Sequence, residues 1–173
     1  MKAVEAAKAR LKFEEFFFIQ LQMQQAKFIR NINVKGHRFE KVGKYFNDFF
    51  HRHLPFELTG AQKRVIREIR KDAGSGKQMN RLLQGDAGSG KTLVALMAML
   101  LAIDNGFQAA IMAPTEILAS QHYKTIAAMT EGLGLSVLLL TGSTKSSQRK
   151  DIHDELQTGR GDIIIGTHAL IEK

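Results

Sequence analysis

The 173-residue sequence predicts an α/β fold: a parallel sheet with helices on both faces, preceded by a helical arm. Three observations predict this fold. After residue 80, short apolar runs alternate four times with helical segments. A glycine-rich loop lies between the first run and the helix that follows it. Residues 3–31 contain neither Gly nor Pro. We therefore expect a helical arm over residues 1–54 and an α/β body over residues 55–173.

The composition limits the function classes that need to be considered. Hydrophobic residues make up 44% of the chain and charged residues 24%, which is typical of a globular protein. Cysteine is absent. This excludes disulfides, Cys-ligated metals and a thiol nucleophile, and it suits a reducing cytoplasm, where we expect the protein. No apolar run reaches membrane-spanning length, so we expect no membrane partner.

The arm carries most of the positive charge and most of the phenylalanine. Up to Leu54 there are 11 Lys and Arg against 5 Asp and Glu, whereas from Pro55 onward there are 14 against 12. Nine of the 11 Phe residues lie in the arm. Two interpretations stay open: contact with nucleic acid, or an amphipathic linker with solvated lysines.

The arm is expected to form two helices. One covers residues 3–31, with an apolar stripe through Leu11, Phe17 and Phe28. The other covers residues 42–52 and ends before Pro55. The spacing of the phenylalanines is typical of core packing, so we expect the arm to pack on the body as a linker.

The body is expected to alternate strands and helices, which requires parallel crossover connections. A helix over 60–71, capped by Thr59, comes first. The elements after it are a strand over 81–84, a helix over 92–104, a strand over 109–113, a helix over 116–129, a strand over 136–140, a helix over 148–157 and a strand over 162–165.

The glycine-rich loop matches the phosphate-binding pattern G-x-x-x-x-G-K-[ST]. Its residues are Gly85, Asp86, Ala87, Gly88, Ser89, Gly90, Lys91 and Thr92. Glycines let the backbone N–H groups wrap a phosphate, and the following helix presents its positive end to the same anion. Lys91 can reach the β- and γ-phosphates of a nucleotide, and the Thr92 hydroxyl can ligate Mg²⁺.

A partial copy of this loop, residues 72–77, is a useful contrast. It repeats the core Asp-Ala-Gly-Ser-Gly-Lys, but Lys71 replaces the leading glycine and Gln78 replaces the hydroxyl. It follows a predicted helix rather than a strand. We expect an exposed connector without a phosphate role.

Gln62 is a candidate for recognising the nucleotide base. Its amide offers one donor and one acceptor, which match the N6 and N7 positions of adenine. Phe56 could stack on the base, and Thr59 lies three residues before Gln62. The alternative is an ordinary surface residue on the 60–71 helix.

Five segments in order resemble one family. They are Leu58-Thr59-x-x-Gln62, the loop 85–92, Ala113-Pro114-Thr115-Glu116-Ile117-Leu118-Ala119, Leu140-Thr141-Gly142-Ser143 and Gly166-Thr167-His168-Ala169-Leu170-Ile171. Together they resemble superfamily 2 helicases and, within them, the RecG family of branch-migration DNA helicases. The resemblance is strong over residues 54–173 and weaker over the arm.

The resemblance implies an ATP-dependent DNA helicase that remodels forks and junctions as a monomer. ATP and Mg²⁺ would be its cofactors, Lys91 and Thr92 its catalytic residues, and Phe56, Thr59 and Gln62 its adenine-reading motif. The residues implied to contact branched or single-stranded DNA are Pro114, Thr115, Glu116, Thr141, Gly142, Ser143, Thr167 and His168. These loops follow predicted strands, so we expect them at the carboxyl edge of the sheet, where they would grip phosphates rather than read bases.

One departure from the family limits this expectation. The acidic pair that holds Mg²⁺ in such motors has no counterpart here, because Asp154-Glu155 lies in a predicted helix rather than at a strand end. We therefore expect a part of a longer protein, without the second motor domain and without ATPase activity of its own. A P-loop kinase and a nucleotide-binding module without DNA translocation stay open as alternatives.

Overall fold

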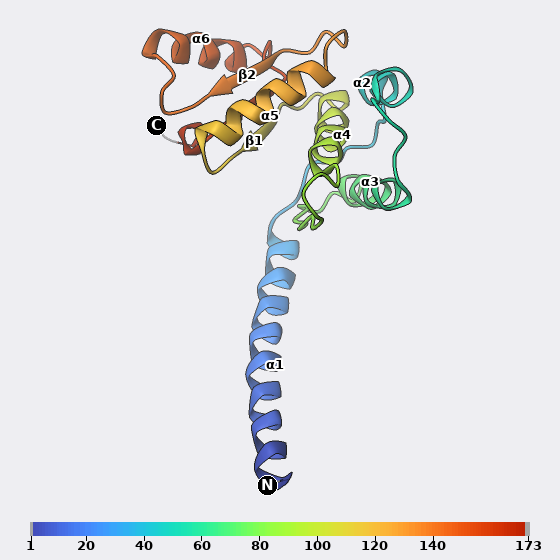
Figure 1. Ribbon diagram of the computed structural model, residues 1–173, viewed down its shortest axis with the longest axis vertical. Coiled ribbons are helices and arrows are strands. Elements are labelled where there is room, and N and C mark those ends of the chain that lie inside the picture. The colour runs from blue at the N-terminus through green and yellow to red at the C-terminus, as the bar shows by residue number, and fades with distance from the viewer. Residues whose placement is uncertain (1, 172–173) are drawn as a thin grey trace.

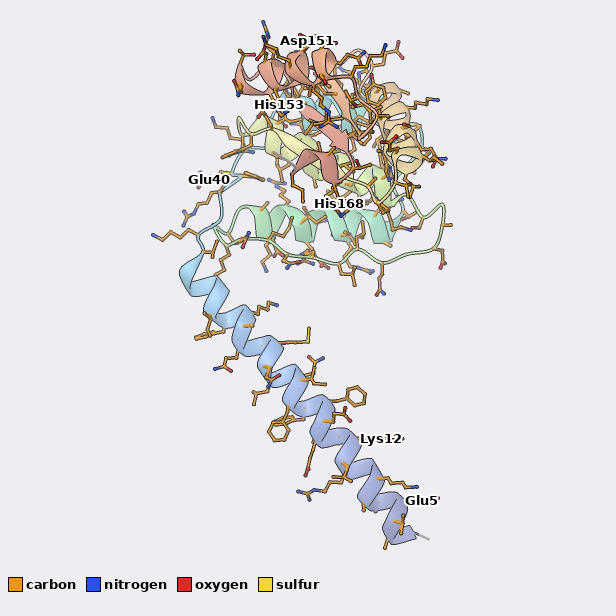
Figure 2. The ribbon with its side chains drawn as sticks, turned by 90° about the vertical axis from the view of Figure 1, so that its left-hand side faces the viewer. Glu5, Lys12, Glu40, Asp151, His153 and His168 are labelled. Carbon is orange, nitrogen blue, oxygen red and sulfur yellow. The ribbon has the colours of Figure 1, made fainter. Side chains whose placement is uncertain are left out.

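A long helix, α1 (Lys2–Asn33), projects from an α/β body in the computed structural model (Figure 1). The structure describes residues 2–171 and, within that range, the side chains of 3–29 and 34–171. Glu5 and Lys12 lie far out on the projecting helix (Figure 2). None of the helices in the described range is long and apolar enough to cross a membrane.

The sheet has three parallel strands in the order β1-β3-β2. Their bounds are β1 (Ala109–Met112), β2 (Val137–Leu140) and β3 (Ile163–Gly166). Ala109 and Val137 both pair with Ile163, so all three strands start and end at the same level. The carboxyl ends of the strands therefore form one edge, as the sequence predicts.

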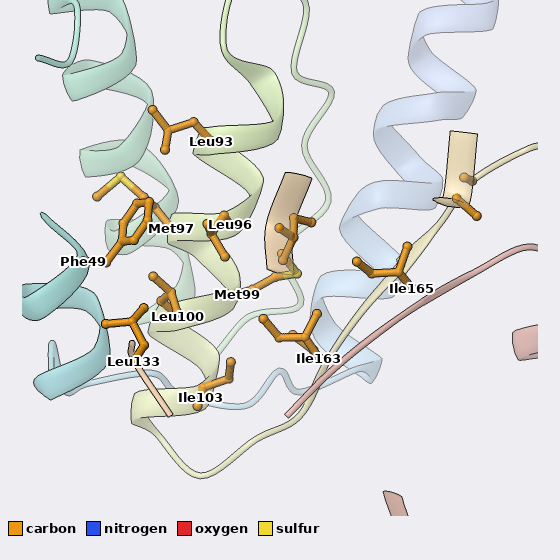
Figure 3. Packing of buried hydrophobic residues seen from close by; sticks show 14 of the residues in the cluster. Phe49, Leu93, Leu96, Met97, Met99, Leu100, Ile103, Leu133, Ile163 and Ile165 are labelled. Carbon is orange, nitrogen blue, oxygen red and sulfur yellow. The ribbon is translucent and has the colours of Figure 1, made fainter. Parts of the chain in front are cut away.

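Helices cover both faces of this sheet, which confirms the predicted fold class. Helices α4 (Lys91–Asp104) and α5 (Glu116–Met129) pack on one face, and α6 (Ser146–Gln157) packs on the other. Successive residues of β3 point to opposite faces of the sheet. Ile163 and Ile165 face α4 and α5 (Figure 3). Ile164 belongs to the cluster beneath α6.

A second helical layer lies on α4. It consists of α2 (Lys44–Asp48), the π-helical turn η1 (Phe49–His53) and α3 (Gly60–Ala73). Because α4 is enclosed by this layer and by the sheet, nine of its fourteen residues are buried, which explains its apolar sequence. Phe49 is fully buried in the same core (Figure 3), so residues 44–53 belong structurally to the body.

The expected strand over 81–84 does not form. No strand within residues 2–171 pairs with this segment, and Leu82 is 84% exposed. A strand needs a ladder of hydrogen bonds, which apolar residues alone do not supply. The segment is instead held to α3 by Arg81, whose guanidinium contacts Glu68 (2.7 Å) and Asp72 (2.6 Å). The hydrogen bond from Arg81 holds the pKa of Asp72 below its usual value.

The apolar stripe of α1 does not pack on the body, contrary to expectation. The side chains of Leu11, Phe16 and Phe28 are each about two-thirds exposed. Phe13 and Phe17 stack on one another along the helix, with ring centroids 5.9 Å apart. An amphipathic stripe requires a partner surface, but the spacing of its residues does not identify which surface that is.

Candidate nucleotide and nucleic-acid site

The glycine-rich loop forms the entry to α4. Gly90 is the N-cap of this helix, with φ +80°, and Gly88 has φ +78°, so both occupy the left-handed region that favours glycine. The Ser89 N–H donates to the Asp86 carbonyl at 3.2 Å and closes a tight turn. The N–H groups of residues 87, 88 and 90 have no hydrogen-bond partner within the described part of the chain, which leaves three donors available to an anion.

Lys91 bridges the loop. Its Nζ donates to the carbonyl oxygens of Gly85 (2.8 Å) and Asp86 (2.7 Å). Thr92 follows in the first helical turn and is half-buried. An arriving phosphate could take over the ammonium from these carbonyls, because a charge-assisted bond to an anion is stronger than one to a neutral carbonyl.

Gln62 connects α3 to this loop. Its Nε2 donates to the Ser89 carbonyl at 3.0 Å, and its Oε1 accepts the Thr59 N–H at 2.9 Å. The second bond completes a capping box with the Thr59 side chain. Gln62 is only 8% exposed, so it is not the surface residue of the alternative interpretation. Each end of its amide makes one hydrogen bond, which leaves one N–H and one oxygen lone pair for an adenine edge.

A cavity of about 340 Å³ opens between α3, the loop and α4. Its lining comprises Thr59, Ala61, Gln62, Val65, Leu83, Gln84, Gly85, Asp86, Ser89, Lys91 and Val94. The structure thus brings Thr59 and Gln62 together with residues of the glycine-rich loop. Phe56 does not line this cavity; it lies in a separate hollow, half-exposed beside Lys63.

These residues fit a nucleotide better than they fit a complete metal site. Two left-handed glycines, available N–H donors and one ammonium suit a phosphate chain. Within residues 2–171, no group of three or more His, Asp or Glu side chains could hold a metal ion. Asp154 and Glu155 lie within α6 and not at a strand end, as the sequence predicts. If a Mg²⁺ arrived with a nucleotide, the Thr92 hydroxyl would offer it a single oxygen.

The loops expected to face DNA meet at the carboxyl edge of the sheet. Segments 114–116, 141–143 and 167–168 follow β1, β2 and β3, respectively. Backbone bonds join the ends of the strands: the Ala113 N–H donates to the Gly166 carbonyl at 2.8 Å. Thr167 is buried, whereas His168 is exposed on the turn after β3 (Figure 2).

Glu116 holds two of these loops together. Its Oε1 accepts the Ser143 N–H and its Oε2 accepts the Ser143 hydroxyl, both at 2.9 Å. Both donors of Ser143 are therefore occupied by a carboxylate, a group that would itself repel a phosphate. The structure assigns Glu116 a contact with a neighbouring loop that its position in the sequence motif does not reveal.

Arg149 on α6 fixes the same loop from the other side. Its Nη2 donates to the Thr141 carbonyl at 2.9 Å and its Nε donates to the Thr144 carbonyl at 3.3 Å. The Thr141 N–H in turn donates to the Thr144 hydroxyl at 2.9 Å. Sequence reasoning missed Arg149, and no local signal could have revealed it, because an arginine in an amphipathic helix is normally solvated.

Asp104 performs a comparable task at the far end of α4. Its carboxylate accepts three backbone N–H groups, from Gly43 (3.0 Å), Tyr45 (2.9 Å) and Phe46 (3.0 Å). These groups belong to the start of α2, which has no side-chain cap of its own. A single helix thus carries the phosphate-binding loop at one end and an anchor for residues 43–46 at the other.

Comparison with known proteins shows where this geometry recurs. Residues 59–173 match the family model of the DEAD/DEAH box helicases. Among curated relatives, the ATP-dependent DNA helicases RecG of Synechocystis sp. and Bacillus subtilis are 46% and 45% identical, over 96% and 99% of this chain. RecG of Thermotoga maritima is 45% identical over 98% of the chain.

These relatives are much longer than the chain, which spans 20%, 25% and 22% of their respective lengths. A solved structure of RecG bound to a three-way DNA junction is also similar, with a TM-score of 0.86 and 45% identity. That match covers 97% of this chain and 23% of the solved one.

Proposed function

The chain belongs to the DEAD/DEAH box helicase family, and from this premise we propose that it supplies the ATP-binding loop and part of the DNA track of a helicase that remodels branched DNA. Similar proteins are named ATP-dependent DNA helicase RecG, and a similar structure holds a three-way DNA junction. The match to a helicase family is also evidence against the alternative that the chain is a P-loop kinase.

One observation carries the nucleotide part of this proposal. Lys91, the available loop N–H groups and the start of α4 converge on the mouth of a cavity of about 340 Å³. Three kinds of positive group at one loop favour a polyphosphate. We assign the phosphates to residues 85–92 and the base side of the cavity to Thr59 and Gln62. Phe56 would have to approach from its own hollow to stack on the base.

ATP bound there would supply the free energy of phosphoryl transfer, and this chain's own residues would orient it. Lys91 would neutralise charge on the terminal phosphates, and Thr92 would offer its hydroxyl to the accompanying Mg²⁺. No hydrolytic step follows from these residues alone. We therefore propose that the 173-residue chain binds nucleotide without turning it over.

The DNA part of the proposal rests on the carboxyl edge of the sheet. Hydroxyls and backbone N–H groups of the loops after β1, β2 and β3 meet there. Such groups contact phosphates and carry no sequence information. We propose that Glu116 acts by shaping the 141–144 loop rather than by touching DNA, because its carboxylate is already bound to Ser143.

Titration with ADP tests the proposal. Lys91→Ala should weaken binding by about 1.5–3 kcal/mol, roughly 12- to 160-fold, because a charge-assisted contact to phosphate is lost. Lys77→Ala is the matched control, since Lys77 ends the partial copy of the same motif and should leave the affinity unchanged. Equal affinity of wild type and Lys91→Ala would refute the phosphate assignment.

A further inference from the structure

One face of α3 is uniformly basic. Successive residues of an α-helix are rotated by about 100° around its axis. Viewed down the axis of α3, an arc of roughly 120° contains seven residues and no others: Gly60, Lys63, Arg64, Arg67, Arg70, Lys71 and Gly74. The five Lys and Arg side chains, which we call the α3 basic face, are all exposed. Within the described part of the chain, none of them forms an ion pair.

This face concentrates the charge of the body. It holds five Lys and Arg and no Asp or Glu, whereas the remainder of 55–173 contains nine Lys and Arg against twelve Asp and Glu. The two acidic residues of α3, Glu68 and Asp72, lie beside the basic arc and are bound by Arg81 at 2.7 and 2.6 Å. Both carboxylates thus form their ion pairs with Arg81 and not with a residue of the face.

The pattern is unfavourable for an isolated helix. Arg67 lies four positions after Lys63, and Lys71 lies four positions after Arg67. Like charges at this i, i+4 spacing repel one another on the surface of a helix. A surface helix that needed only solubility would interleave acidic residues, as many surface helices do. The repulsion is relieved when a polyanion binds along the face.

We propose that the α3 basic face binds the phosphate backbone of duplex DNA, as a contact surface separate from the loops at the sheet edge. It is separate because the apolar side of α3 packs on α4, and α4 lies between α3 and the sheet. This inference rests on the DNA-binding part of the proposed function and adds a site to it.

The dimensions and chemistry of the face fit a nucleic-acid backbone. From Lys63 to Lys71 the helix rises about 12 Å, which spans three to four phosphates of one strand at about 3.4 Å each. The arc has no aromatic or aliphatic side chain that could act as the buried anchor of a protein interface. It also has no carboxylate or amide that could read a base edge, so binding should be independent of sequence.

The salt dependence of duplex binding tests this proposal. The test variant combines Lys63→Gln, Arg67→Gln and Lys71→Gln. The control combines Lys124→Gln, Lys150→Gln and Arg160→Gln, which also replace two exposed lysines and one exposed arginine. Fluorescence anisotropy with a 20-base-pair duplex between 50 and 200 mM KCl gives the slope of log K against log [salt]. Three lost phosphate contacts should flatten this slope by about 2.7 in the test variant and leave it unchanged in the control.

Three results would overturn the inference. A test variant that keeps the wild-type slope shows that the face does not touch DNA. A test variant that loses binding to polyglutamate but not to the duplex shows that the face binds acidic protein instead. If the wild-type chain does not bind the duplex, the DNA contacts proposed for the loops at the sheet edge are refuted as well. ADP titration still tests the nucleotide site independently.

Discussion

Substituting Gln62 separates two roles that the structure gives to one side chain. The amide donates to the Ser89 carbonyl and accepts from the Thr59 N–H, so it supports the phosphate-binding loop and completes the cap of α3. Gln62→Ala removes both bonds, whereas Gln62→Glu keeps an acceptor for Thr59 but has no donor for Ser89.

The magnitudes follow from the two bonds. A net hydrogen bond contributes about 0.5–1.5 kcal/mol, so Gln62→Ala should lower the free energy of unfolding by about 1–3 kcal/mol. Gln62→Glu keeps the capping-box acceptor but places a nearly buried carboxylate oxygen against the Ser89 carbonyl, so it should lose at least as much stability as Gln62→Ala. Both variants should bind ADP roughly 2- to 13-fold more weakly, since each loses the bond of about 0.5–1.5 kcal/mol that fixes the loop. The carboxylate of Gln62→Glu should weaken binding further by repelling phosphate.

Urea denaturation measures the free energy of unfolding, and calorimetric titration measures the affinity for ADP. Titration with GDP as a second nucleotide distinguishes the two roles of Gln62. If Gln62 acts by holding the loop, the losses for ADP and GDP should be equal, because both carry the same diphosphate. A loss confined to ADP would refute this reasoning and show that the amide reads adenine. An unchanged affinity for both nucleotides would refute either role.

Three further outcomes are expected. Asp104→Ala should reduce the free energy of unfolding in urea by about 1.5–3 kcal/mol, because three N–H groups at the start of α2 lose a charged acceptor, and Asp104→Asn should lose less. Glu116→Ala should raise hydrogen exchange at the Ser143 amide about tenfold, which corresponds to one lost charge-assisted bond, with little change in global stability; unchanged exchange would contradict the clamp. Arg81 lowers the pKa of Asp72 below its ordinary value of 3.8, so this pair stabilises the fold fully above that value and its contribution is lost as the pH falls through the lowered pKa. The stability of wild type should therefore approach that of Arg81→Gln as the pH falls below 3.8, and a constant difference would contradict the ion pair.

The sequence predicts the elements whose signals are local. Thr59 caps α3 as expected, because a hydroxyl just before a helix accepts a hydrogen bond from one of its first N–H groups. Thr115 caps α5 in the same way, although this cap was not predicted from the sequence. The five ordered motifs also predict the family correctly. Parallel crossovers then fix the common edge where the loops after β1, β2 and β3 meet.

The predictions fail where a segment depends on a partner outside its own sequence. Residues 81–84 have the apolar character of a strand, but no described strand pairs with them. The stripe of α1 has the period of a packed helix but meets no surface of the body. Contacts such as Glu116 with Ser143 join residues 27 positions apart, and residue type alone cannot specify which hydroxyl a carboxylate will find.

Gly90 shows how two distant motifs constrain each other. A phosphate-binding loop needs glycine here for its φ of +80° and for close approach of the backbone to an anion. The structure adds a second reason: a Cβ at this position would strike Nε2 of Gln62, the atom that donates to the Ser89 carbonyl. Any side chain at position 90 would therefore displace the amide as well as strain the backbone. The capping box of α3 and the loop before α4 form one unit, in which the glycine leaves the space that the glutamine fills.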